Sequence, residues 1–310
     1  MRDEYVARIN RVVDHIQDHL QEELTLESLA RIACFSPYHF HRIFRSIVGE
    51  PLHQFIKRVR LERAASHLIW APQRPITEIA LDAGFASPAA FARAFRDRFG
   101  MSASEYRTEQ ESKNGQAMRK PGNAGAQVEM YVDPGAWAPK WRVIMQEKNN
   151  EVNVEVKELP ERTIAYLRHT GPYQGNAELF GRLFGQLAQW AGPRGLLGPQ
   201  TQFLSVYHDD PATTEPEKLR LTCALVVPPD TDVQGEIGKS TVLAGRYAVG
   251  HFELSTEEFT TAWDTMYADW LPASGYQPDD RPPMELYLND ASQHPEKKHI
   301  VEICVPVKPL

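Results

Sequence analysis

The sequence has little of what marks a membrane protein, a disulfide-bonded secreted domain or a metal site. No run approaches the ~18 consecutive apolar residues that a membrane helix needs, and the opening MRDEYVARIN mixes charges where a signal peptide would be apolar. The 3 cysteines, Cys34, Cys223 and Cys304, have no CxxC spacing. We therefore expect a cytoplasmic protein without a membrane partner, metal ion or cofactor, and cysteines buried as small apolar side chains.

Charge is distributed unevenly along the chain. The 310 residues carry a formal net charge of −7. Residues 1–107 hold 15 basic and 13 acidic side chains, a net charge of +2, whereas residues 108–310 hold 19 and 28, a net charge of −9. A protein that is acidic overall binds nucleic acid poorly, but a locally basic domain can bind it. The asymmetry favours two domains with different partners.

One sequence pattern occurs twice in the basic part. LARIACFSPYHFHRIFRSIVG, residues 29–49, matches IALDAGFASPAAFARAFRDRFG, residues 79–100, at several alanines, phenylalanines and arginines. In each copy a short helix and a turn precede a second helix that Ser-Pro opens, with Ser36 and Ser87 as the N-caps. Each copy is therefore predicted to be a helix-turn-helix unit.

Further signals complete this all-helical domain. Residues 4–22 have the apolar spacing of an amphipathic helix, and Thr25 caps the next one. Gly49 and Gly100 end the second helix of each copy. Residues 52–70 form a connecting helix of about 28 Å at 1.5 Å per residue. Since one turn of DNA is ~34 Å, either the duplex bends or one unit seats poorly.

The second helix of the first copy carries a polar stripe opposite its apolar face. The stripe is spaced i, i+3, i+4 and i+7 and consists of Tyr38, His41, Arg42 and Arg45. Donors and an aromatic ring suit a helix that enters the major groove, where they meet base edges and thymine methyl groups. Charged stripes are often merely solvated, but recurrence after the second Ser-Pro favours DNA binding.

The matching stripe of the second copy has lost polar groups. It consists of Ala89, Ala92, Arg93 and Arg96. Because phosphate contacts position a protein and base contacts specify the sequence, we expect the first unit to supply most base recognition. The second unit should supply mainly phosphate contacts through Arg96, with one guanine contact from Arg93. Ser36 and Ser87, at the starts of the two helices, are further candidate DNA-binding residues.

The middle of the chain separates this domain from a mixed one. Residues 108–127 are polar and typical of a flexible linker. Residues 128–150 are ambiguous, since VEMYV has strand character and DPGAWAPKW is loop-like. We expect a DNA-binding domain over 1–107, a linker with a possible first strand over 108–150, and a second domain over 151–310.

The second domain alternates strands with two helices. Strand-like runs include VNVEVKEL, TIAYLRHT, FLSVYH, LRLTCALVV, RYAVGHFEL, MELYL and HIVEICVPV. Helices are expected near 174–191 and 256–271, the latter opened by a Ser255–Glu258 capping box. TIAYLRHT and RYAVGHFEL each precede a helix, which indicates a duplication with a period near 80 residues.

Glu285 is the main candidate for ligand binding in this domain. It lies in MELYL, and Tyr287 is its same-face neighbour at i+2. A carboxylate on an inward face needs a cationic partner or a proton, and the rings of Tyr173, Tyr207 and Trp263 offer stacking or cation–π surface. Alternatively, Glu285 faces water and the aromatic residues fill the core.

The helix-turn-helix pair, over roughly residues 8–107, resembles the DNA-binding domain of AraC/XylS-family activators, which place two such units on one connecting helix. The resemblance implies base contacts from the first unit and from Arg93 in the second. The implied first-unit positions are Tyr38, His41 and Arg42. The alanines before Arg93 depart from the polar residues common in that family.

Residues from about 152 to 310 resemble a GyrI-like effector-binding domain through RHTGPYQG, YHDDP, AGRYAVGHFE, PPMELYLND and EICVPVK. The combination resembles the Rob type of regulator. It implies two βαββ halves around a pocket for amphipathic, often cationic, molecules, as in multidrug sensing, with a buried glutamate as counter-charge. The expected fold class is multidomain: an all-α tandem helix-turn-helix domain followed by an α+β domain of duplicated βαββ units.

The leading interpretation is a non-enzymatic transcriptional regulator. It binds double-stranded DNA through its first domain and a small-molecule effector of cationic and aromatic character through its second, and RNA polymerase is a further candidate partner. Two alternatives concern the C-terminal domain: a small-molecule hydrolase with Glu285 as general base, or a protein-interaction module without a pocket.

Overall fold

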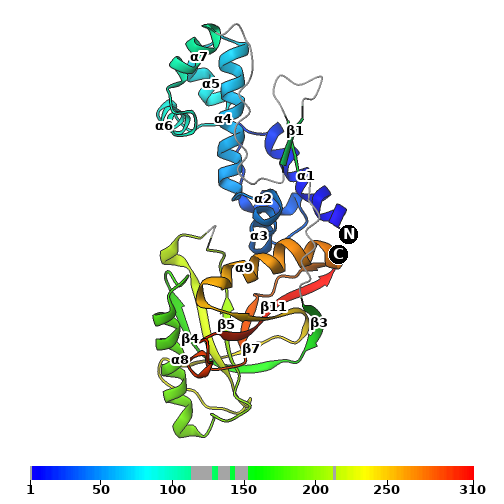
Figure 1. Ribbon diagram of the computed structural model, residues 1–310, viewed down its shortest axis with the longest axis vertical. Coiled ribbons are helices and arrows are strands. Elements are labelled where there is room, and N and C mark those ends of the chain that lie inside the picture. The colour runs from blue at the N-terminus through cyan, green and yellow to red at the C-terminus, as the bar shows by residue number, and fades with distance from the viewer. Residues whose placement is uncertain (1, 113–127, 132–139, 144–152, 212–213) are drawn as a thin grey trace. The chain divides into compact units, whose positions relative to one another are not determined.

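The computed structural model describes residues 2–112, 128–131, 140–143, 153–211 and 214–310. The chain divides into two compact units, Asp3–Glu147 and Lys148–Leu310 (Figure 1). Of the predicted linker, residues 113–127 lie outside the described residues, and α7 extends past residue 107 to Ser112. The domain limits at 107 and 150 therefore stay a prediction.

The described part of the first unit is mainly helical. Its helices are α1 (Arg2–Asp18), α2 (Leu26–Ile32), α3 (Pro37–Val48), α4 (Leu52–Trp70), α5 (Ile76–Asp82), α6 (Pro88–Phe99) and α7 (Ala103–Ser112). Both predicted helix-turn-helix units are confirmed as α2–α3 and α5–α6, and the connecting helix α4 has the predicted limits. α1 ends earlier than residue 22, because the chain turns there and the carbonyl oxygens of Leu20 and Glu22 accept hydrogen bonds from Arg60 of α4.

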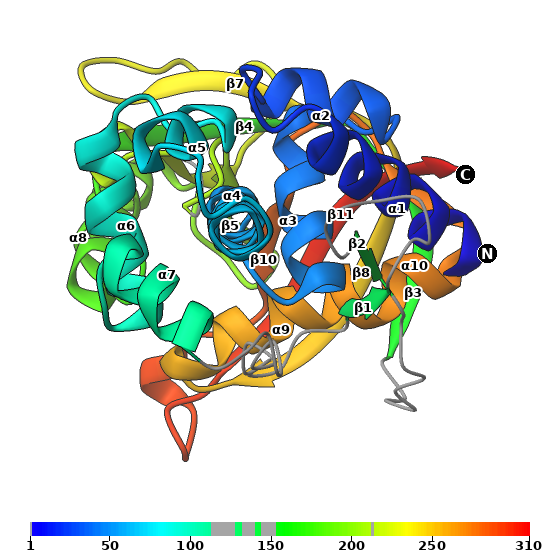
Figure 2. The ribbon, with the colours of Figure 1, turned by 90° about the horizontal axis from the view of Figure 1, so that it is seen from above.

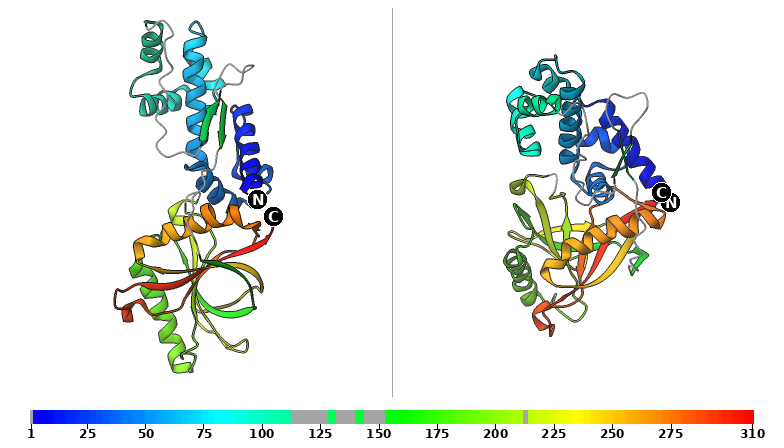
Figure 3. Two further views of the ribbon diagram at one scale, coloured as in Figure 1. Left: turned by 45° about the vertical axis from the view of Figure 1, so that its right-hand side comes forward. Right: turned by 45° about the horizontal axis from the view of Figure 1, so that its top comes forward.

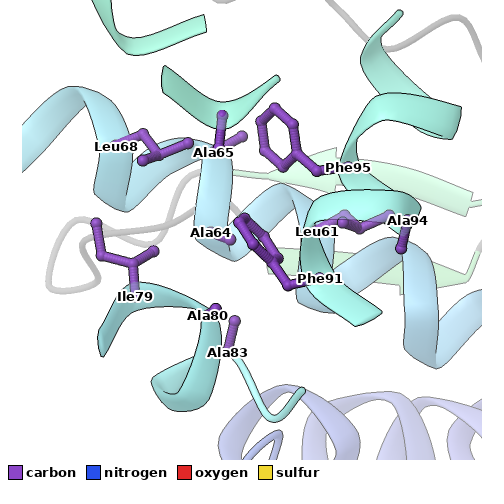
Figure 4. Close-up of a cluster of buried hydrophobic side chains, with 11 residues drawn as sticks. Leu61, Ala64, Ala65, Leu68, Ile79, Ala80, Ala83, Phe91, Ala94 and Phe95 are labelled. Atoms are coloured by element: carbon purple, nitrogen blue, oxygen red, sulfur yellow. The ribbon is translucent and has the colours of Figure 1, made fainter. Parts of the chain in front are cut away.

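The connecting helix lies between the two helix-turn-helix units. Figure 2 looks down α4, with α1–α3 on one side and α5–α7 on the other. Phe44 of α3 packs against Phe55 of α4, with ring centroids 5.5 Å apart. On the other side, Leu61 and Leu68 of α4 meet α5 and α6 in a buried apolar cluster (Figure 4). Both units are therefore held by one helix through separate apolar cores.

The two recognition helices begin differently despite their shared Ser-Pro. Ser87 accepts a hydrogen bond from the backbone N–H of Ala90 at 3.2 Å, as expected of an N-cap. Ser36 has extended backbone angles but makes no side-chain cap hydrogen bond, so the predicted cap is wrong for the first copy. Gly49 and Gly100 end the helices in the left-handed conformation, with φ of 85° and 73°.

Cys34 corrects the expectation that all three cysteines are buried. Cys223 and Cys304 are buried, whereas Cys34 is exposed. It occupies the turn between α2 and α3 with a φ of 57°, and its counterpart in the second copy is Gly84, with a φ of 85°. The turn needs a left-handed residue, which glycine adopts freely and cysteine adopts at a cost.

Gly84 has a second role that the sequence does not reveal. A Cβ atom at this position would lie 1.9 Å from the carbonyl oxygen of Leu20, which follows α1. The Nε atom of Arg60 donates to the same oxygen at 3.0 Å. The turn of the second helix-turn-helix unit thus rests directly on the backbone between α1 and α2, and only glycine fits there.

A short hairpin follows the helices in the chain. β1 (Val128–Tyr131) and β2 (Lys140–Val143) pair antiparallel, with Met130 opposite Trp141. VEMY was an expected strand, whereas the end of DPGAWAPKW was expected as loop and contributes to β2 instead. Nothing in the isolated sequence of β2 signals a strand, because its pairing partner supplies the order.

The second unit contains a large antiparallel sheet. Its strands are β3 (Val154–Leu159), β4 (Arg162–Thr170), β5 (Phe203–Tyr207), β6 (Arg220–Val226), β7 (Gly238–Val242), β8 (Gly245–Leu254), β9 (Tyr276–Pro278), β10 (Met284–Tyr287) and β11 (His299–Pro309). The order is β3-β8-β11-β10-β5-β6-β4-β7, and β9 pairs with β11. The seven predicted strands are present, while β7 and β9 were missed.

The sheet order confirms the duplicated βαββ units. β4, helix α8 (Ala177–Ala191), β5 and β6 form one unit. β8, helix α9 (Phe259–Asp264) with its continuation, β10 and β11 form the other. The two meet at β10 and β5 in the middle, and equivalent strands follow in mirrored order on either side.

The two short connections before β4 and β8 force the sheet to curl. β3 and β4 hold the first and seventh places of the strand order, which in a flat sheet are about 29 Å apart at ~4.8 Å per strand. Only Pro160 and Glu161 join them, a span of at most about 11 Å. The curl is visible in Figure 3, and its concave side holds one apolar cluster that includes Ile164, Tyr247 and Met284.

Two helical segments lie against the sheet's other face. α8 is capped by Asn176, whose side chain accepts from the Leu179 N–H at 3.0 Å. The second segment opens with the predicted Ser255–Glu258 capping box. It then changes from α9 to a π-helix (Thr265–Trp270) and to α10 (Leu271–Ser274), a change that the apolar spacing did not predict. No helix in the described part of the chain is long and apolar enough to cross a membrane.

Replacing Cys34 by glycine should stabilise the first helix-turn-helix unit. The left-handed region costs a residue with a side chain ~1–2 kcal/mol, and glycine removes this cost. Part of this stabilisation is offset because glycine raises the conformational entropy of the unfolded chain. We expect the local free energy of unfolding to rise by about 0.5–1 kcal/mol. Hydrogen exchange of the α2 and α3 amides measures it, and an unchanged or lower protection would contradict strain at this turn.

Replacing Gly84 by alanine should destabilise the second unit far more than the same change at Gly100. Both glycines have positive φ, but nothing lies within 4 Å of a Cβ atom at Gly100. Strain alone costs ~1–2 kcal/mol, and displacing the Leu20 carbonyl adds ~1–3 kcal/mol at Gly84 only. Hydrogen exchange of the α5 and α6 amides should separate the two variants; equal losses would mean that the contact with Leu20 contributes nothing.

Candidate functional site

The polar stripe of α3 is partly exposed. Arg45 is exposed and Tyr38 and Arg42 are half-buried, with the Arg42 guanidinium 5.7 Å from the centre of the Tyr38 ring. His41, expected on the exposed stripe, is instead buried. It follows Phe40 directly and so stands at the border between the polar and the apolar face of the helix.

The second recognition helix presents arginines beside small residues. Arg93 and Arg96 of α6 are exposed, as are the alanines at positions 89 and 92. Neither arginine forms an ion pair with a residue that the structure describes. Ser36 and Ser87 are half-buried at the starts of α3 and α6. The DNA contacts predicted for all these residues stay predictions.

An ion-pair network that the sequence analysis missed joins both recognition helices to α4. Arg58 of α4 binds Glu50, just beyond α3, and its Nη1 lies 3.3 Å from Glu62 Oε2, one turn along α4. Glu62 Oε1 also lies 3.7 Å from Nη2 of Arg98 in α6. The i, i+4 spacing of Arg58 and Glu62 was a readable signal, but the link to α6 needed the fold. This network fixes how the two recognition helices are presented.

Glu285 stands at the centre of the sheet's helix-facing side. In β10 it pairs with Ser205 of β5, and Tyr207 lies two residues further along that strand. Because side chains alternate along a strand, Met284 and Leu286 enter the concave apolar cluster. Glu285 and Tyr287 thereby point to the face that α8 and α9 cover. Glu285 is 1% exposed.

Three hydrogen bonds hold the carboxylate of Glu285. Its Oε2 atom accepts from the hydroxyl groups of Tyr207 and Tyr287, each at 2.7 Å. Its Oε1 atom accepts from the indole N–H of Trp263 in α9, also at 2.7 Å. These donors satisfy both carboxylate oxygens away from water. The alternative in which Glu285 faces water is therefore wrong.

The five predicted ligand-site residues lie together. The rings of Tyr173 and Tyr207 have centroids 5.6 Å apart, and those of Tyr207 and Trp263 lie 5.7 Å apart and nearly perpendicular, at 84°. The Tyr173 hydroxyl donates to the carbonyl of Asp209 at 3.3 Å. We call Glu285, Tyr287, Tyr207, Tyr173 and Trp263 the aromatic carboxylate site.

Burial keeps the site's tyrosines as neutral donors. The pKa of Tyr207 and that of Tyr287 are both raised well above the usual value, first by burial and then by the nearby Glu285 charge. Burial also raises the pKa of the neighbouring Cys223 thiol to about 12. The site therefore offers one carboxylate among neutral groups and lacks a thiolate nucleophile at neutral pH.

Several residues around the site escaped the sequence analysis. Phe184 of α8 packs edge-on against Tyr287, with centroids 5.3 Å apart, and Ser205 lies 3.4 Å from the Tyr287 hydroxyl. Tyr267 stacks on Trp263 at 6.2 Å from within the π-helix. The apolar spacing of α8 marked Phe184 as inward-facing, but no local signal assigned Ser205 or Tyr267 to Glu285. Among the described residues no cluster of histidine, cysteine, aspartate or glutamate could hold a metal ion.

Comparison with known families agrees with both halves of this geometry. Residues 152–308 match the GyrI-like small molecule binding domain. Residues 29–109 match a helix-turn-helix domain. The two matches cover the curled sheet with its helices, and the segment from within α2 into α7.

Curated relatives match one half each. A DNA gyrase inhibitor of Edwardsiella piscicida is 33% identical over 162 residues, 51% of this chain and 99% of that protein. The probable transcriptional regulator LumQ of Photobacterium leiognathi is 35% identical over 103 residues, 33% of this chain and 41% of that protein. Among solved structures, the EcmrR C-terminal domain covers 52% of this chain and 100% of its own, with 19% identity and a TM-score of 0.44.

Two helix-turn-helix units on a shared connecting helix are the arrangement of the AraC type, and the GyrI-like match extends over half of the chain. The chain therefore belongs to the GyrI-like family of small-molecule-binding domains and carries that domain behind an AraC-type DNA-binding domain, as a transcriptional regulator.

Proposed function

We propose that this regulator is controlled by an amphipathic cation that binds at the aromatic carboxylate site. The observation that carries the proposal is the buried Glu285 carboxylate, held by three neutral donors among aromatic rings. A cation bound here would be attracted by the carboxylate, and the aromatic rings would contact its apolar part.

The energetics favour a cation over a neutral ligand of the same shape. A cation over a tyrosine or tryptophan face gains about 0.5–2 kcal/mol, more when water is excluded. A carboxylate at 1% exposure interacts strongly with a nearby charge because little water screens it. The net charge of −9 over residues 108–310 adds a long-range attraction for cations. The family's small-molecule role supports a ligand at this domain.

On the DNA side, we propose unequal roles for the recognition helices. α3 would read bases through Tyr38, Arg42 and Arg45, with His41 at the edge of this set. α6 would mainly hold phosphates through Arg96, with one guanine contact from Arg93. Arginine forks fit guanine edges, while exposed arginines beside alanines fit the backbone. The N-terminal ends of both helices, at Ser36 and Ser87, would approach phosphates.

The partners follow from these two sites. The proposed partners are double-stranded DNA, a small cationic and aromatic effector, and RNA polymerase, which a regulator bound near a promoter can contact. A protein that acts on chromosomal DNA in a bacterium works in the cytoplasm, and we place this chain there. The proposal assigns the second domain no catalytic step.

Replacing Glu285 by glutamine should abolish the preference for cations. We expect tetraphenylphosphonium to bind the full chain and tetraphenylborate, its anionic counterpart of the same shape, to bind at least tenfold more weakly. Loss of one buried charge–charge contact costs ~2–5 kcal/mol, so the Glu285→Gln variant should bind tetraphenylphosphonium at least tenfold more weakly. Isothermal titration calorimetry measures both affinities.

The matched control is Glu257→Gln, which removes an exposed carboxylate from the start of the α9 segment in the same domain. It should leave both affinities unchanged. Equal binding of the phosphonium by wild type and Glu285→Gln would refute the proposed site. Turnover of ester or amide substrates that disappears in Glu285→Gln would instead assign the domain to a hydrolase.

Replacing Arg42 by alanine should change DNA specificity, whereas replacing Arg96 should change affinity alone. Loss of a bidentate base contact costs ~1–3 kcal/mol at one position. Loss of a phosphate contact weakens all sequences alike and lowers the salt slope by about 1. Binding to a duplex selected from a random library by the wild-type chain, compared with unselected duplex at several salt concentrations, measures both effects. Equal loss of discrimination in the two variants would contradict unequal roles.

A further inference from the structure

The second unit contains a cavity at the edge of the sheet beside α8, apart from the residues of the aromatic carboxylate site. Its volume is about 440 Å³. Three segments line it: the later half of β4, one face of α8, and the loop that leads into β7. The lining residues used below are Tyr166, Arg168, His169, Arg182, Glu236 and Gly238. Figure 1 shows α8, β4 and β7 in this part of the unit.

The cavity carries an excess of positive charge. Arg168 of β4 and Arg182 of α8 both line it, and neither forms an ion pair with a residue that the structure describes. The guanidinium of Arg168 lies over the Tyr166 ring, 5.2 Å from its centre. Glu236 is the one carboxylate among the lining residues, so two guanidinium groups face a single acidic group. Two like charges on one small cavity attract an anion.

Near the cavity, some backbone and side-chain groups of β4 have no hydrogen-bond partner among the described residues. β7 pairs with β4 only as far as Tyr166, opposite Gly238, while β4 continues to Thr170. The edge of β4 beyond Tyr166 therefore has no strand paired to it on this side among the described residues. The imidazole of His169 lines the cavity as well, and its buried Nε2 atom makes no hydrogen bond within the described structure. An anion with acceptor oxygens would satisfy such donors.

Contacts within the protein fix the part of the cavity formed by Tyr166 and the loop into β7. Gly238 lies so close to the Tyr166 ring that a Cβ atom would be 2.5 Å from its Cζ atom. Lys239 anchors the preceding loop, because its Nζ atom donates to the Thr231 carbonyl at 2.9 Å. Tyr166, Leu167, Leu183 and Ile237 add apolar surface. The lining is thus mainly polar, with a few apolar side chains beside a cationic rim.

We propose that this cavity is a second ligand site, which binds a small organic carboxylate. Arg168 and Arg182 hold the carboxylate group, and the organic part of the ligand lies against the aliphatic side chains of Leu183 and Ile237. Guanidinium groups bind carboxylates through two parallel hydrogen bonds, which makes them suited to this anion. The site is independent of Glu285 and has the opposite charge preference, so that one domain can respond to two classes of molecule.

Benzoate is the probe for this site, with benzylammonium as its cationic counterpart of similar size. Saturation-transfer NMR on the full chain should give a dissociation constant for benzoate on the order of 1 mM. Arg168→Gln and Arg182→Gln should each raise that constant about tenfold, the usual effect of losing one charge-assisted pair. Glu236→Gln should lower it, because the variant removes the one opposing charge.

Two controls keep the test specific. Arg194→Gln removes an exposed arginine that packs on Trp190 near the end of α8, outside the cavity, and should leave benzoate binding unchanged. Glu285→Gln should also leave it unchanged, so failure of the aromatic carboxylate site and failure of this one are distinguishable. Absence of benzoate binding at tens of millimolar, unchanged binding in both arginine variants, or equal binding of benzylammonium would each overturn the proposal.

Discussion

The burial of one carboxylate is the constraint on which the second unit depends. A charged group removed from water needs donors on each of its oxygens. Glu285 obtains one from Tyr287 of its own strand β10 and two from segments distant in sequence, Tyr207 of β5 and Trp263 of α9. Those segments come together only because the two βαββ halves meet at β10 and β5. The duplication and the curl of the sheet thus place a negative charge beneath two helices, where aromatic rings can surround it.

The first unit depends on a different requirement, a fixed distance between two DNA-reading helices. α4 separates them with 19 residues, about 28 Å of rigid helix. The ion pairs of Arg58, Glu62 and Arg98 hold the second unit to that helix. The turn at Gly84 also contacts the Leu20 carbonyl, which accepts a hydrogen bond from Arg60 of α4. The α4 helix is shorter than a ~34 Å DNA turn. If the protein stays rigid, either the DNA bends or one unit binds loosely. The alanines beside Arg93 on α6 fit the second outcome.

The two proposed ligand sites of the second unit carry opposite charges. The aromatic carboxylate site presents a buried anion, and the cavity between β4 and α8 presents two guanidinium groups. The two sites can differ because alternate residues of a strand point to opposite faces of the sheet. Leu167 of β4 packs with α8, whereas Tyr166 belongs to the other face. Where β7 stops, both faces reach one edge, and the open edge makes the second cavity.

Local chemistry in the sequence was enough for the helix-turn-helix repeat, the limits of α4, the capping box at Ser255 and most strands, because caps, turns and apolar periods act over a few residues. It was also enough to single out Glu285, an acidic residue inside an apolar strand. The sequence named Tyr207 and Trp263 as site candidates but could not show that they donate to Glu285, and it did not show the contact of Gly84 with Leu20, the exposure of Cys34 or the burial of His41. Strand β7 and the cavity beside α8 depended equally on the fold. These features arise where segments distant in the chain meet, and the free energy of such contacts is set by packing that no local pattern encodes.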